Sequence, residues 1–70
     1  MKKVEGFDKR LRKAIADRKM TCRQVSMLAG VPRNSLNAYL NEGVMPCCLY
    51  LVKLAKLLKV STDYLLGLEE

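Results

Sequence analysis

Histidine and tryptophan are absent from this sequence of 70 residues, and aromatic residues are limited to one phenylalanine and three tyrosines. Without histidine, a common general base of enzymes and a frequent metal ligand are both missing. With so few aromatic residues, the core must be aliphatic, which suits short helices better than strands. The acidic residues are scattered and form no pair in an apolar setting, so we do not expect an enzyme.

Only three cysteines occur, at positions Cys22, Cys47 and Cys48, and their number and spacing argue against disulfide bonds and metal binding. Their number is odd, no secretory signal precedes them, and the neighbouring Cys47 and Cys48 are poorly placed to bridge each other. None has the C-x-x-C spacing of zinc ligands. We therefore predict a reducing cytosol, no metal and no other cofactor. We expect all three cysteines to be small, mostly buried hydrophobic residues rather than redox sensors.

Long apolar runs and alternating patterns are missing as well. No run approaches the roughly 20 residues that cross a membrane, and no segment alternates polar and apolar residues as a half-buried strand does. There is no low-complexity stretch, linker or repeat. Because the length suits one domain, the sequence predicts a single all-α domain over residues 1–70.

Positive charge is abundant but unevenly distributed. Lysine and arginine number 13 against seven acidic residues, which gives a net charge of +6. Eight of the basic side chains lie in residues 1–20, against three acidic ones, whereas the charges of residues 47–70 cancel. This excess favours a polyanionic partner, of which nucleic acid is the commonest. A face that is merely solvated would give the same composition, so both interpretations stay open.

Glycines and prolines divide the chain into five short helical segments. Apolar residues at helical spacing predict the first helix from about Phe7 to Lys19. The second begins at Thr21, which forms a T-x-x-Q capping box with Gln24, and it ends at Gly30. The remaining helices are predicted at about 32–40, 47–58 and 61–67.

Each of the first four helices has an apolar face that we expect in the core: Phe7, Leu11, Ala14 and Ile15; Val25, Leu28 and Ala29; Leu36, Tyr39 and Leu40; and Leu51, Leu54, Ala55 and Leu58. The fourth helix has more apolar residues than this face requires. The surplus residues Leu49, Tyr50 and Leu57 are a candidate dimer interface. Small helical proteins also expose some leucine, so dimerisation and ordinary exposure both remain open.

The third helix has an outward face that is polar but hardly charged. The face comprises Arg33, Asn34, Asn37, Ala38 and Asn41. Because asparagine is a poor helix former, three of them on a short face indicate a chemical use. Asparagine bonds bidentately to adenine, and arginine to guanine, in the major groove of DNA. Helix capping would explain Asn34 and Asn41 but not Asn37, so the pattern favours base reading.

The segment Thr21–Gly43, TCRQVSMLAGVPRNSLNAYLNEG, resembles the helix-turn-helix of the lambda-type repressor and Cro family, also called Xre-type. The resemblance covers roughly residues 7–67 and includes the closing segment LVKLAKLLKVSTDYLLG. Its anchors are small and apolar residues, namely Val25, Ser26, Gly30, Val31, Leu36, Tyr39 and Pro46. It implies a compact five-helix lambda-repressor-like fold with the motif at about 21–41.

In that family the second helix of the motif lies in the major groove, and the first lies across the phosphate backbone. The resemblance therefore implies base reading by Arg33, Asn34, Asn37 and Ala38, where the alanine suits a thymine methyl group. It also implies contacts at the DNA backbone or groove edge by Arg23, Gln24, Pro32, Ser35 and Asn41.

Three residues depart from the family's pattern. Cys22 stands where many relatives have glutamine, so the phosphate contact of that glutamine is in question. Ser26 replaces the usual alanine. Lys59 stands where relatives often have glycine, which predicts a slightly strained bend after the fourth helix.

The sequence thus predicts a regulator of transcription that binds double-stranded DNA, best interpreted as a repressor occupying a palindromic operator as a homodimer, at least on DNA. The basic residues of the first 13 positions either add phosphate contacts or supply only a long-range field. They are Lys2, Lys3, Lys9, Arg10, Arg12 and Lys13, of which Lys2, Lys3 and Arg10 are the first candidates for contact. The resemblance implies a bacterial or phage-encoded, cytoplasmic and nucleoid-associated protein, and 70 residues leave no room for a domain that binds a small-molecule ligand. The alternative is an antitoxin-like protein-interaction module with accessory DNA binding.

Overall fold

The computed structural model describes residues 6–68. Within that range there are five α-helices and no strands, which confirms the predicted all-α fold. Each predicted helix is present, with ends that differ from the prediction by at most two residues. The helices are α1 (Phe7–Asp17), α2 (Cys22–Ala29), α3 (Arg33–Asn41), α4 (Cys48–Leu58) and α5 (Thr62–Leu66).

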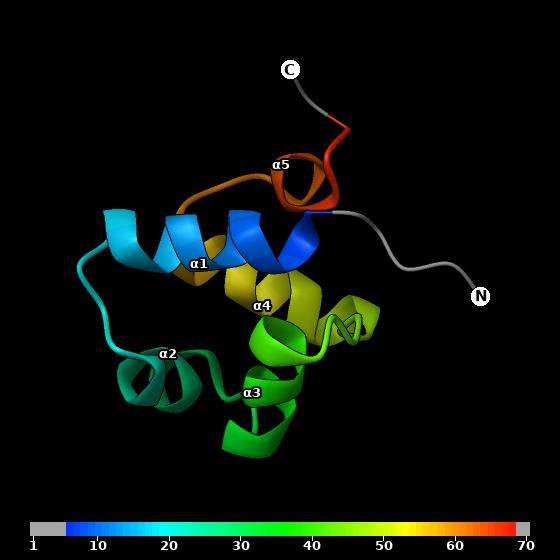
Figure 1. Ribbon diagram of the computed structural model, residues 1–70. Helices are drawn as coiled ribbons and strands as arrows, with labels where there is room; N and C mark the ends of the chain where they lie inside the picture. The colour runs from blue at the N-terminus through cyan, green and yellow to red at the C-terminus, as the bar shows by residue number, and fades with distance from the viewer. Residues whose placement is uncertain (1–5, 69–70) are drawn as a thin grey trace.

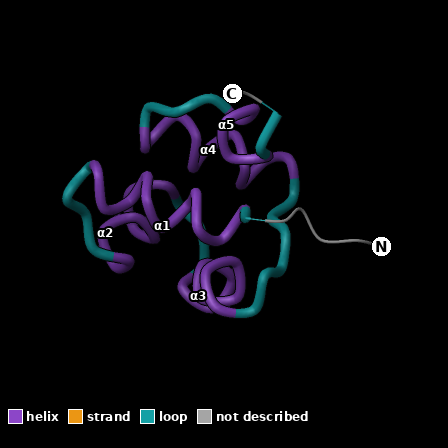
Figure 2. Tube along the Cα trace, turned by 45° about the horizontal axis from the view of Figure 1, so that its top comes forward, coloured by secondary structure: helices purple, strands orange, loops and turns teal. Residues whose placement is uncertain are grey.

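The helices are arranged as a ring in which each has two principal neighbours. Helix α1 lies between α5 and α3 (Figures 1 and 2), α3 packs on α2, α2 packs on α4, and α4 returns to α5. The apolar faces point into this ring. As a result α3 is held by α1 and α2 on one side, and its other side faces outward.

One aliphatic core fills the ring, and it confirms most of the predicted apolar faces. The largest fully buried side chains are Phe7, Leu11, Val25, Val31, Leu36, Leu54, Leu58 and Leu65. Two expectations were wrong, since Leu51 is only half-buried and Leu28 is 63% exposed. Helix α2 is short and ends at Gly30, and its fully buried residues are Val25 and Ala29, one turn apart.

The prediction of mostly buried cysteines was also wrong for two of the three. Cys22 is partly buried and packs against the core, but Cys47 and Cys48 are exposed. The reason is their position at the beginning of α4, where Cys47 is the N-cap and Cys48 the first helical residue. The core face of α4 is formed further along by Leu54, Ala55 and Leu58.

Candidate nucleic-acid interface

The outward face of α3 is exposed as the sequence predicted. Its buried side consists of Leu36, Tyr39 and Leu40. On the opposite side the polar residues Arg33, Asn34, Asn37 and Asn41 are exposed, and Ala38 is partly buried between them. The helix therefore presents a row of hydrogen-bonding side chains to solvent, which is the property that a helix in the major groove requires.

The turn before α3 is fixed by hydrogen bonds to one residue of α2. Gly30 takes the left-handed conformation (φ 71°), and the backbone N–H groups of Gly30 and Val31 both donate to the Ser26 carbonyl at 3.1 Å. The Ser26 hydroxyl donates to the Val31 carbonyl at 2.6 Å. These bonds tie the beginning of α3 to α2 and so set the angle at which the polar face is presented. The sequence showed Ser26 as a small anchor residue in place of the usual alanine, and it did not indicate this hydrogen bond.

Pro32 and Ser35 lie at the edge of the polar face. Pro32 is exposed and is the N-cap of α3, one position before the first turn in which it was expected. Ser35 is half-buried and forms a hydrogen bond with Tyr39. Burial raises the pKa of the Tyr39 phenol above its ordinary value, and the bond from Ser35 lowers it by less. The serine is therefore engaged on the inner side of the helix in this structure.

The beginning of α2 has the predicted capping box. The Thr21 hydroxyl accepts from the Gln24 backbone N–H at 3.1 Å, and the Gln24 Oε1 accepts from the Thr21 N–H at 2.8 Å. With its oxygen engaged in this way, Gln24 directs its amide N–H donors to solvent. Arg23 is exposed beside it. A helix N-terminus with an arginine and a side-chain amide is suited to a phosphate group.

Arg12 of α1 joins this site; the sequence marked it only as one of several basic residues of the first helix that could contact phosphate. Its Nη2 donates to the Leu40 carbonyl at 3.2 Å and to the Asn41 Oδ1, both at the end of α3. The cation is thus placed where the helix dipole is negative. Because the Oδ1 of Asn41 is occupied, its amide N–H donors are the group available to a phosphate.

A shallow hollow of about 300 Å³ connects the elements of this site. Arg12 of α1, Cys22 at the beginning of α2 and Leu40 near the end of α3 all line it. The predicted backbone contacts at Arg23 and Asn41 follow directly after two of these lining residues. Arg12 therefore lies at the Asn41 end of the site, and its charge favours an anion there.

Arg10, a candidate phosphate contact, is engaged elsewhere. Its Nε donates to the Leu65 carbonyl of α5 at 3.1 Å. Its guanidinium also lies close to Gly6 and Gly67, where an added Cβ would come within 2.8 and 2.7 Å of its nitrogens. Arg10 therefore fastens α5 to α1 in this structure. Lys2 and Lys3, the other first candidates, lie outside the described residues.

The three residues of the candidate dimer interface differ in exposure. Leu49 is 60% exposed, whereas Tyr50 and Leu57 are half-buried and pack against the core. Leu57 also lies two helical turns further along α4. Leu49 instead shares a face with Val52, which is 41% exposed.

A metal site and a membrane span find no support in residues 6–68. No group of three or more acidic or cysteine side chains there is arranged to hold a metal ion. None of the helices in the same range has the length and apolar character needed to cross a membrane. The exposed polar face of α3, with its flanking arginines, is therefore the candidate functional site.

Comparison with known proteins agrees with this geometry. A family model described as a helix-turn-helix domain matches residues 9–70. Searches of curated proteins and of solved structures return no match. The matched range includes the predicted motif at 21–41, and it begins within α1 and extends through α5.

Proposed function

The chain belongs to the helix-turn-helix domain family, and from that premise we propose that it is a transcriptional repressor that acts by occupying a DNA operator. The observation that carries the proposal is the polar, nearly uncharged face of α3, which is exposed while its opposite face is buried. In this proposal α3 lies in the major groove. Arg33, Asn34, Asn37 and Ala38 then read the base edges.

The phosphate backbone is contacted on both sides of α3 in this proposal. Arg23 and the amide of Gln24 bind a phosphate at the beginning of α2, where the N-terminal dipole adds to the attraction. The amide of Asn41 and the guanidinium of Arg12 bind another at the end of α3. Pro32 and Ser35 border the groove. Each cation that truly contacts a phosphate adds about one unit to the slope of log affinity against log salt.

A palindromic operator and a homodimer complete the proposal. One recognition helix reads few base pairs, so two copies on an inverted repeat provide the specificity that a single copy lacks. The exposed pair Leu49 and Val52 supports a contact between copies near the beginning of α4. The single DNA-binding domain over residues 1–70 and a bacterial or phage origin, with action in the cytoplasm at the nucleoid, belong to the same proposal.

Selection from a random duplex pool, with salt raised in each round, tests the function. We expect an enriched motif that survives about 0.2 M salt, since purely electrostatic binding is lost there. Arg33→Ala and Asn37→Ala are expected to relax the motif at separate base positions, each by about 1–3 kcal/mol of discrimination. Lys9→Ala, an exposed change on α1, serves as the control and leaves the motif unaltered.

Two outcomes would contradict the proposal. Failure to enrich any motif at that salt concentration would show that the positive charge is a nonspecific field. A motif that both α3 variants leave unchanged would remove the assigned base readers, even though DNA binding itself would stand.

A further inference from the structure

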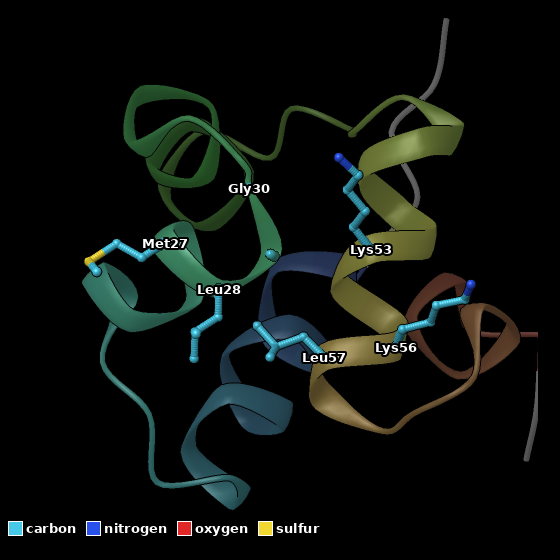
Figure 3. Close-up of a pocket in the computed structure, with 7 residues that line it drawn as sticks. Met27, Leu28, Gly30, Lys53, Lys56 and Leu57 are labelled. Carbon is cyan, nitrogen blue, oxygen red and sulfur yellow. The ribbon is translucent and has the colours of Figure 1, made fainter.

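An open groove lies between the end of α2 and α4, and its lining includes none of the residues assigned to DNA (Figure 3). Its volume is about 600 Å³. The side formed by α2 and the following turn contributes Met27, Leu28 and Gly30, and the side formed by α4 contributes Lys53, Lys56 and Leu57. The groove therefore combines apolar side chains with two cations.

Two apolar side chains of the groove, Met27 and Leu28, are exposed and lie outside the core. Met27 is 71% exposed and Leu28 is 63% exposed. Both are on the last turn of α2. Leu28 lies opposite Leu57 of α4, whereas the Met27 side chain points away from α4 at the edge of the groove (Figure 3). Clustered apolar exposure of this kind, bordered by polar groups, is typical of a binding surface.

The charge of the groove is positive throughout. Lys53 and Lys56 are three residues apart on α4 and so lie on neighbouring parts of its surface. The lining includes no acidic residue. The salt bridge found within residues 6–68 lies on α1, between Lys13 and Asp17, and does not involve the groove lysines. The Lys53 Nζ instead lies 6.0 Å from the centre of the Tyr50 ring. Neither groove lysine is thus neutralised by a carboxylate of the described chain.

We propose that this groove binds an acidic amphipathic segment of another protein. Apolar side chains of that segment pack on Met27, Leu28 and Leu57, and its carboxylates meet Lys53 and Lys56, in the manner of a helix laid in a hydrophobic groove. Charge complementarity selects this occupant. A second copy docked groove to groove would bring the lysines of both copies together, which is unfavourable. Phosphates of DNA would leave the methionine and leucine without apolar partners.

Titration of the isotope-labelled chain with a synthetic peptide tests the proposal by NMR. The peptide is about three helical turns long, with leucine on one face and glutamate on the other, and a matched peptide carries lysine in place of each glutamate. We expect saturable shifts of the Leu28, Gly30 and Leu57 amide signals with the acidic peptide alone. Lys56→Glu is expected to weaken this binding about tenfold.

The control for that variant is Lys9→Glu, which makes the same change in net charge at an exposed position of α1. It is expected to alter the affinity for the peptide by less than about twofold. Leu28→Gln provides a second test, because the side chain is largely exposed and its loss leaves the core intact. It too is expected to weaken binding. Circular dichroism checks that each variant is folded.

Several results would overturn the proposal. Equal binding of both peptides, or equal loss in Lys9→Glu and Lys56→Glu, would show that the groove does not select acidic segments. Groove signals that shift with chain concentration alone would assign the surface to a second copy. Groove signals that shift with duplex DNA as they do with peptide would assign it to the nucleic-acid interface. None of these results depends on whether the repressor proposal holds.

Discussion

Arg10 and Arg12 have different partners although they lie only two residues apart. Two residues on an α-helix are about 200° apart, so the two side chains leave α1 on nearly opposite sides. Arg10 reaches the Leu65 carbonyl in α5, and Arg12 reaches the Leu40 carbonyl at the end of α3. Charge counting along the sequence treats them alike. Helix geometry separates them once the neighbours of α1 are known.

The bond from Arg12 to Asn41 predicts energetic coupling in DNA binding. Arg12→Ala frees the Asn41 side chain to rotate and removes a cation from the end of α3, so we expect weaker binding to the selected operator. Asn41→Ala should weaken it too, and the double variant should lose less than the sum, with a coupling of about 0.5–3 kcal/mol. Fluorescence anisotropy at fixed salt measures all three affinities.

Lys9→Ala is the matched control for this cycle, since it removes an exposed cation from the same helix. It should show no coupling to Asn41→Ala. Additive losses from Arg12→Ala and Asn41→Ala would mean that the arginine acts only through its charge and does not orient the asparagine.

At the scale of the elements, sequence predicts the helices well because their ends depend on local signals. The Thr21 capping box and the Gly30 stop are decided within a few residues, and both are present. The outward face of α3 was predictable for the same reason. The contact line of α2 was not, because the exposure of Leu28 depends on how closely α4 approaches. The hydroxyl bond from Ser26 likewise requires the folded turn.

The end of α4 carries a prediction about stability. Lys59 takes the left-handed conformation (φ 56°, ψ 42°), as its place in the family pattern predicted. A residue with a Cβ atom is destabilised there by about 1–2 kcal/mol relative to glycine. Glycine loses more chain entropy on folding, which partly offsets this difference. We expect Lys59→Gly to raise the free energy of unfolding by up to about 1 kcal/mol in urea denaturation.

The same substitution one turn earlier provides the contrast. Lys56 lies within α4, where glycine costs about 1 kcal/mol relative to a good helix former. Lys56→Gly should therefore lower the free energy of unfolding. If both variants were destabilised equally, the bend at Lys59 would not be strained.

On the scale of the whole molecule, three surfaces are formed by different side chains, although Leu49 and Val52 lie on the same face of α4 as the groove lysines. The polar face of α3 points outward, the lysine-bordered groove lies between α2 and α4, and Leu49 with Val52 lies at the beginning of α4. In a chain this small, each surface is formed by only a few side chains. A substitution at one surface can therefore be used as a control for another.

Dimeric binding can be tested because these surfaces are formed by different side chains. If two copies meet through Leu49 and Val52 on an inverted repeat, Leu49→Gln removes apolar contact area between them and leaves each recognition helix unchanged. We expect the variant to lose cooperative binding to the full operator while its affinity for an isolated half-site stays within about twofold, because apolar burial, rather than any base contact, is lost. Leu28→Gln, at the groove, is the matched control and should preserve cooperativity. Mobility-shift titrations on both duplexes measure the two quantities. Unchanged cooperativity in Leu49→Gln would place the contact between copies elsewhere. An equal loss of affinity for the half-site would show that Leu49 supports the DNA-binding structure of each copy rather than the contact between copies.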